Sequence, residues 1–110
     1  MRYRPLMLYK VAEMTEKDEI LAVLRAALPD LKRRSPIRSL AVFGSVARGE
    51  ANAASDVDML VEVACPLGLS EFLALEDALS ALVRRRVDLV TRAALKPYIG
   101  VHVLGEAVGL

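Results

Sequence analysis

Several features are scarce in this chain of 110 residues, and each absence excludes a class of protein. Cys65 is the only cysteine, which excludes an internal disulfide and suits a reducing cytosol. No apolar run is long enough to span a bilayer, and residues 1–14 lack the apolar stretch of a signal peptide. We therefore expect a cytoplasmic protein with no membrane partner. The net charge of +1 lacks the basic excess typical of nucleic-acid binding, so we expect none.

The composition is that of an ordinary globular domain. Hydrophobic residues make up 55% of the chain and charged residues 26%, and the length suits one domain with its own core. Residues 1–14 show no clean period, so we expect an N-terminal arm followed by a single domain over residues 15–110.

Periodicity predicts helices and strands in the order α-β-β-α-β-α. Apolar residues at helical spacing follow a capping-box-like start at Thr15, and Ser70 is the expected N-cap of the second helix. The predicted helices cover about residues 16–33, 71–83 and 94–105, and the predicted strands cover about residues 38–43, 57–63 and 86–91. The fold class is α/β (α+β), with helices packed against a small mixed sheet.

The most informative motif is Gly44-Ser45, followed after ten residues by Asp56-Val57-Asp58. In a strand, residues i and i+2 project to the same face, so Asp56 and Asp58 lie side by side and repel each other unless a cation lies between them. Mg²⁺ suits such oxygen ligands, and it binds one or two carboxylates together with substrate phosphates. Glycine allows close approach of the backbone, and Ser45 offers an N–H and a hydroxyl to a phosphate oxygen. This combination predicts nucleotide chemistry.

Asp88 lies in the middle of an otherwise apolar strand, where an unpaired charge is costly. If that strand pairs with the one that follows Asp56, the three carboxylates share one face and suit a two-metal site for nucleotidyl transfer. The alternative is an ion pair between Asp88 and an arginine at the strand end (Arg84, Arg85 or Arg86).

Four segments resemble the minimal nucleotidyltransferases, which belong to the DNA polymerase β-type nucleotidyltransferase superfamily and are the antitoxin partners of HEPN toxins. The matching segments are Phe43–Glu50, Ser55–Glu62, Arg86–Thr91 and Leu95–Pro97. Their order and spacing agree with the family over about residues 15–108, and the acidic pattern is complete.

The resemblance implies a polymerase β-like nucleotidyltransferase core and a role for each motif residue. Gly44 and Ser45 would hold the phosphates of ATP, and the motif acids would bind two Mg²⁺ ions and carry the catalysis; these acids are Asp56, Asp58 and Asp88. Arg48 lies in the matching loop, where two roles are open: contact with a phosphate, or a structural ion pair with Glu50 or Asp56.

The family implies an Mg²⁺-dependent adenylyltransferase that moves AMP from ATP to a tyrosine of a HEPN toxin, within a type VII toxin–antitoxin pair. Two alternatives stay open: an antitoxin that inhibits by covering its partner without catalysis, and a subunit that modifies a small molecule. A homo- or hetero-oligomer is compatible with either.

Overall fold

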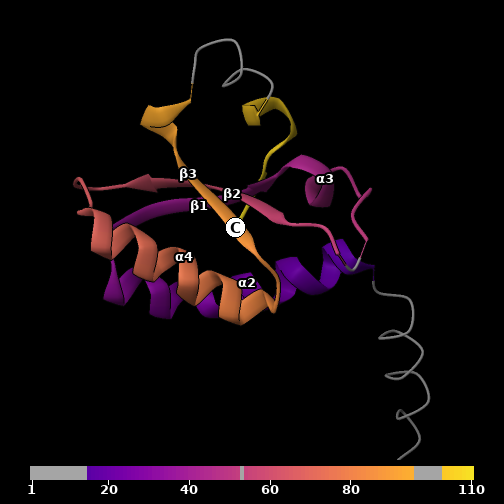
Figure 1. Ribbon diagram of the computed structural model, residues 1–110, viewed down its shortest axis with the longest axis horizontal. Helices are drawn as coiled ribbons and strands as arrows, with labels where there is room; N and C mark the ends of the chain where they lie inside the picture. The colour runs from indigo at the N-terminus through magenta and orange to yellow at the C-terminus, as the bar shows by residue number, and fades with distance from the viewer. Residues whose placement is uncertain (1–14, 53, 96–102) are drawn as a thin grey trace, which may run out of the picture.

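The computed structural model describes residues 15–52, 54–95 and 103–110 of the chain, and Figure 1 shows its arrangement. The elements, in chain order, are α2 (Glu16–Arg34), β1 (Ile37–Phe43), α3 (Gly44–Ala47), β2 (Val57–Val63), α4 (Leu69–Val83), β3 (Val87–Thr91), a 3₁₀ turn (Arg92–Ala94) and β4 (Val108–Gly109). The predicted arm at residues 1–14 lies outside the described residues.

The sheet is mixed, as its sequence predicts. Its four strands stand in the order β3-β2-β1-β4. β1 runs antiparallel to β2 and to β4, whereas β3 runs parallel to β2 after the crossover through α4. The long helices α2 and α4 lie side by side on one face of the sheet, and α3 lies at the end of β1 (Figure 1). The predicted α/β class with helices packed on a small mixed sheet is confirmed.

Helix α2 begins where the sequence predicts. The Thr15 hydroxyl accepts a hydrogen bond from the Asp18 N–H, and the Asp18 carboxylate accepts one from the Thr15 N–H. Pro29 lies inside the helix and does not end it. Three basic residues in the last turn complement the helix dipole.

The core fills the space between the sheet and the two long helices. Alternate residues of β2 point into it, and Val57, Met59 and Val61 are fully buried. They pack in one cluster with Leu24 of α2 and Leu79 of α4, which are also fully buried. Because alternation sends the intervening residues to the opposite face, the polar side chains of β2 lie on the side away from the two helices.

Helix α4 begins earlier than predicted. Its N-cap is Gly68 rather than Ser70, and the Glu71 carboxylate accepts a hydrogen bond of 3.1 Å from the Gly68 N–H. The Ser70 hydroxyl is therefore inside the first turn. We predicted Ser70 because a serine side chain can cap a helix. Here the Glu71 carboxylate, at the third helical position, accepts the hydrogen bond of the Gly68 N–H instead.

The predicted last helix, residues 94–105, is confirmed at its described C-terminal part and is wrong at its start. The chain leaves β3 through a 3₁₀ turn at Arg92–Ala94, Leu95 is not helical, residues 103–106 are helical, and β4 follows. The middle of the predicted helix, residues 96–102, lies outside the described residues. β4 pairs with Ala41 and Val42 of β1 and brings the C-terminal segment, residues 103–110, across the sheet.

The outer edge of β3 is covered by side chains of α4. The Ser80 hydroxyl accepts a hydrogen bond of 3.1 Å from the Val87 N–H, and the Glu76 carboxylate accepts one of 2.9 Å from the Leu89 N–H. Both backbone groups would otherwise lie unpaired at the edge of the sheet.

A search of the described helices for a membrane span found none with the required length and apolar character.

Candidate active site

Asp58 and Asp88 occupy directly paired positions on two neighbouring parallel strands. Asp58 is the second residue of β2 and Asp88 the second residue of β3, and their Cα atoms are register partners. Asp58 is half-buried and Asp88 is exposed. Their neighbours in sequence, Val57 and Val87, are buried, so both carboxylates project from the face of the sheet opposite the long helices.

Asp56 immediately precedes β2 and is placed by a hydrogen-bonded turn. The Asn52 N–H donates to the Ser55 hydroxyl at 3.0 Å, and the Ser55 N–H donates to the Asn52 carbonyl at 3.1 Å. Arg85 donates to the same carbonyl at 2.7 Å and also forms an ion pair with Glu16. The turn before Asp56 is therefore tied to α2 and to the residues that follow α4.

The three carboxylates interact electrostatically at Asp58. Partial burial raises the pKa of the Asp58 carboxyl, and the negative charges of Asp88 and Asp56 raise this pKa further. The Arg48 guanidinium lowers it, and the Glu106 carboxylate raises it. Of the three predicted acids, Asp58 and Asp88 are paired across the two strands, and the charge of Asp56 acts on Asp58. Arg85, one of the alternative partners of Asp88, is instead paired with Glu16 and the Asn52 carbonyl.

Gly44 lies against the Asp58 carboxylate and has no room for a side chain. Its φ is +74°, a conformation that glycine adopts readily. A Cβ atom at this position would lie 2.2 Å from Asp58 Oδ2, which is far inside van der Waals contact. The turn from β1 into α3 therefore brings the backbone directly beside the acidic group, and Ser45 follows as the second residue of α3.

Arg48 is held by two carboxylates. Its Nε donates to Glu50 at 2.9 Å, and its Nη1 donates to the two oxygens of Glu106 at 3.2 and 3.0 Å. Of the two roles that the sequence left open, the ion pair with Glu50 is present, and a second one joins Arg48 to the C-terminal segment. These contacts raise the pKa of Arg48.

Glu106 is the residue at this site that sequence reasoning missed. Its Oε1 also accepts a hydrogen bond of 3.0 Å from the Gly44 N–H. Glu106 is 62 residues from Gly44 in sequence and lies in a segment whose strand of two residues gives no periodic signal. The pairing of β4 with β1 brings it to the site.

The carboxylates at this site supply some, but not all, of the oxygen ligands that a hard divalent cation needs. Among the residues that the structure describes, no group of three or more Asp, Glu, His or Cys side chains is close enough to hold a metal ion by itself. The like charges that crowd Asp58 nevertheless favour a bound cation. Mg²⁺ usually takes only one or two carboxylates and completes its shell with water and phosphate oxygens. The site therefore fits a metal that arrives with its nucleotide.

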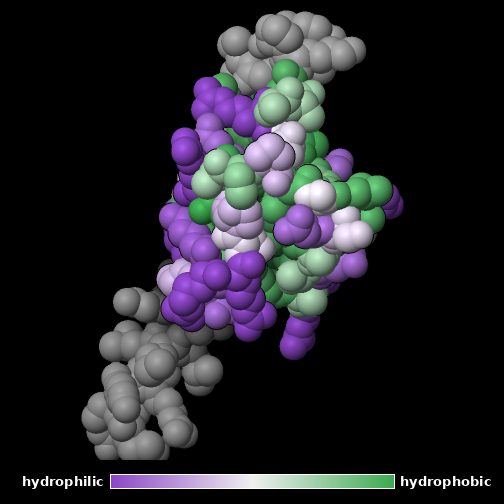
Figure 2. All heavy atoms as spheres, turned by 90° about the vertical axis from the view of Figure 1, so that its left-hand side faces the viewer, coloured by the Kyte–Doolittle hydropathy of each residue, from purple (hydrophilic) through white to green (hydrophobic). Residues whose placement is uncertain are grey.

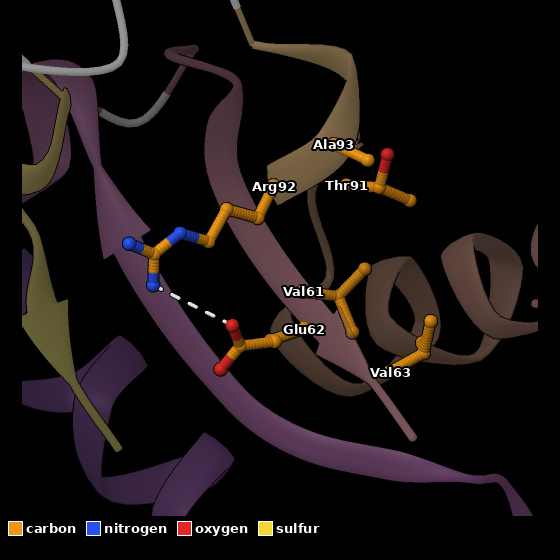
Figure 3. Close-up of a pocket in the computed structure, with 6 residues that line it drawn as sticks. All are labelled: Val61, Glu62, Val63, Thr91, Arg92 and Ala93. Atoms are coloured by element: carbon orange, nitrogen blue, oxygen red, sulfur yellow. Dashed lines mark hydrogen bonds and ion pairs between the residues drawn. The ribbon is translucent and has the colours of Figure 1, made fainter. Parts of the chain in front are cut away.

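A cleft of about 330 Å³ lies farther along the same strands (Figure 3). Its walls include Val61 and Val63 of β2, and Arg92 spans it to form an ion pair of 3.4 Å with Glu62. A second, more apolar cleft of about 600 Å³ shares Val63 and continues toward the start of α4. Neither cleft is lined by the three acids.

The mixed sheet places the Gly-Ser turn beside the paired acids Asp58 and Asp88. The family model for the nucleotidyltransferase domain matches residues 24–108. The chain belongs to this nucleotidyltransferase family, and it is an enzyme of that class.

Curated relatives agree with this assignment over most of the chain. Protein adenylyltransferase MntA of Thermococcus cleftensis is 43% identical over 95 residues, which cover 86% of this chain and 96% of the relative. Among solved structures, one described as a minimal nucleotidyltransferase is 39% identical with a TM-score of 0.74, and the match covers 89% of this chain and 98% of that one. A crystal structure of a toxin–antitoxin with AMP-PNP shares the fold at 22% identity, with a TM-score of 0.61 and coverage of 84% and 70%.

Proposed function

We propose that this enzyme is a protein adenylyltransferase that transfers AMP from ATP to a tyrosine of a HEPN toxin and thereby acts as its antitoxin. The pairing of Asp58 with Asp88 beside the Gly44 turn is the observation that carries the proposal, because it suits metal-assisted nucleotidyl transfer. Because such a reaction consumes ATP on a partner inside the cell, the proposed location is the cytoplasm.

The relatives support the choice of reaction and partner. The Thermococcus cleftensis relative is named a protein adenylyltransferase, and this chain covers nearly all of its length. A chain of a more distant solved complex, a tri-AMPylated Shewanella oneidensis HEPN toxin with an MNT antitoxin, shares the fold at 20% identity and a TM-score of 0.54. The proposal takes AMP transfer as the reaction, and a helical toxin as the acceptor, from these proteins.

Each carboxylate has a proposed role. Asp56 and Asp58 would hold Mg²⁺, which would supply positive charge to neutralise the charge that develops on the phosphoryl oxygens. Asp88, which faces solvent beside Asp58, accepts the proton of the acceptor hydroxyl. The hydroxyl oxygen attacks the α-phosphorus of ATP, a new phosphoester bond forms, and pyrophosphate leaves.

The turn at the end of β1 is proposed to hold the phosphates that leave. Ser45 offers its N–H and hydroxyl, and Gly44 lets the backbone approach closely because it has no Cβ. Arg48 is exposed at the end of the same turn, and a guanidinium with five donors can contact a phosphate while it keeps its carboxylate partners.

The surface of the domain supports a protein as the acceptor. Figure 2 looks at the end of the molecule where β2 leads into α4, and it shows apolar side chains gathered beside hydrophilic ones. The cleft of about 600 Å³ at this end is lined by Val63, Pro66 and Phe72, and Leu69 at its rim is 76% exposed. An apolar patch bordered by polar groups is typical of a surface that binds another protein.

The decisive experiment is intact-mass spectrometry of the cognate HEPN toxin after incubation with this protein, ATP and Mg²⁺. We expect the toxin mass to rise by one or more AMP residues, with tandem spectra placing them on tyrosine. The purified, modified toxin should then stay inactive. A double variant, Asp56→Ala/Asp58→Ala, should fold, bind the toxin and leave its mass unchanged. An unmodified toxin that the double variant still inhibits would favour the alternative of inhibition by covering.

A further inference from the structure

The Glu106 carboxylate holds both ends of the turn that is proposed to bind the nucleotide phosphates. One oxygen, Oε1, accepts from the Gly44 N–H at 3.0 Å and from Arg48 Nη1 at 3.2 Å, and Oε2 accepts from the same Nη1 at 3.0 Å. Gly44 opens helix α3, and Arg48 is its C-cap. A single side chain thus fixes the backbone at the start of the turn and the guanidinium at its end.

Charge and exposure distinguish Glu106 from the other partner of Arg48. The Glu106 side chain is 31% exposed, whereas that of Glu50 is 64% exposed and accepts from Arg48 Nε alone. Glu50 accepts from the Nε of the planar guanidinium and Glu106 accepts from its Nη1. The orientation of the Arg48 guanidinium is therefore set before any ligand binds. An arginine that is already oriented loses less side-chain freedom on binding a phosphate.

The Glu106 carboxylate also interacts electrostatically with Asp58, which is proposed to bind the metal. Its negative charge contributes to the raised pKa of Asp58, whose Oδ2 lies beside Gly44. Glu106 is therefore within electrostatic range of the acids as well as in contact with the turn. It reaches this place because β4 pairs with Ala41 and Val42 of β1, directly before the turn begins.

We propose that Glu106 is a positioning residue for nucleotide binding, which orients Arg48 and the Gly44–Ser45 backbone toward the phosphates of ATP. The inference rests on the proposed function, because it assumes that this turn holds the nucleotide. It adds the C-terminal segment, residues 103–110, to the parts of the chain on which the site depends.

Glu106→Gln is the sharpest test, because the amide keeps an oxygen for the Gly44 N–H and removes the charge that pairs with Arg48. We expect Kd and KM for ATP with Mg²⁺ to rise about three- to tenfold, because an Arg48 side chain that is no longer oriented must be ordered on binding, with a much smaller change in kcat. Glu62→Gln is the matched control, since it removes one carboxylate from an ion pair with Arg92 outside the site. It should leave the Kd for ATP unchanged.

A double-mutant cycle on the Kd for ATP separates positioning from general stability. If Glu106 acts through Arg48, Glu106→Gln should have almost no further effect in an Arg48→Gln background. Thermal melting of each variant shows whether it is folded. Additive effects in the cycle, an unchanged Kd in Glu106→Gln, or tighter ATP binding would each overturn the inference, the last because it would make Glu106 a competitor of the phosphates.

The outcome of this test is distinguishable from failure of the proposed function. If the wild-type protein adenylylates the toxin and the Glu106 variants bind ATP normally, only the inference fails. If the wild-type protein binds no ATP with Mg²⁺, the proposed function fails first.

Discussion

Asp58 and Asp88 stand opposite each other on parallel strands, so two acidic side chains project from adjacent positions on one face of the sheet. This arrangement opposes the stability of the metal-free protein, because partial burial and like charges raise the pKa of Asp58 above its ordinary value. Conflict of this kind between folding and charge is typical of functional sites.

The first prediction is that Asp58→Asn raises the melting temperature of the metal-free protein at neutral pH by a few degrees. The folded state binds a proton at Asp58 that the unfolded chain has already released, so the free energy of unfolding falls as pH rises from the usual Asp pKa to the raised one. Above that window the ionised carboxylate opposes folding, and below the usual pKa it no longer does. The gain from Asp58→Asn should therefore shrink as the pH is lowered through the window.

Thermal melts of both proteins in EDTA across this pH range test the sign. Asp30→Asn is the control, because Asp30 lies at the exposed end of α2 and pairs with Arg33 and Arg34. It should not raise the melting temperature. A wild-type protein that is more stable than Asp58→Asn at neutral pH would contradict the proposed crowding.

The second prediction concerns metal. Since the acids crowd one another without a cation, ATP should bind tightly only when Mg²⁺ or Mn²⁺ is present, and Asp58→Asn should weaken that dependence. Calorimetric titration of ATP with Mg²⁺ and with EDTA measures both affinities. Equal affinity in the two buffers would remove the role proposed for Asp56 and Asp58.

The third prediction uses two glycines with the same backbone conformation. Gly44 and Gly49 both have φ of +74°. A Cβ atom at Gly49 would have no other atom within 4 Å, whereas a Cβ atom at Gly44 would overlap Asp58 Oδ2. Gly49→Ala should cost about 1–2 kcal/mol for the left-handed conformation and leave turnover intact. Gly44→Ala should cost more and abolish adenylylation. Urea denaturation and the toxin mass assay measure the two effects, and equal turnover in both variants would exclude the close approach as a functional requirement.

The fourth prediction separates phosphate binding from metal binding. Ser45→Ala removes one hydrogen bond to a charged phosphate, worth roughly 1.5–3 kcal/mol, so the rate should fall about ten- to a hundredfold. Asp56→Ala should abolish turnover. The kcat/KM for ATP in AMP transfer at saturating Mg²⁺ measures both, and equal loss in the two variants would assign Ser45 a further role.

Local patterns predict most of the fold here, and tertiary pairing determines the rest. The capping box at Thr15 and the alternation along β2 are encoded by neighbouring residues, so the first helix and the strands come within about a residue of their observed bounds. β4 has two residues and exists because β1 offers it an edge, which no local pattern can indicate. Likewise, the acids and the Gly-Ser turn are visible as a motif, whereas Glu106 reaches Arg48 from 58 residues away.

The covered edge of β3 has a consequence for how copies of this domain can associate. Because Glu76 and Ser80 already accept hydrogen bonds from the outward N–H groups of Leu89 and Val87, an incoming strand would find these donors occupied. Pairing of strands between molecules, a common route to aggregation and to dimers with a continuous sheet, is thereby blocked on this side. An assembly of this enzyme with a continuous intermolecular sheet would therefore have to form at the opposite edge, which β4 and β1 provide, with the β3 edge left outside the contact.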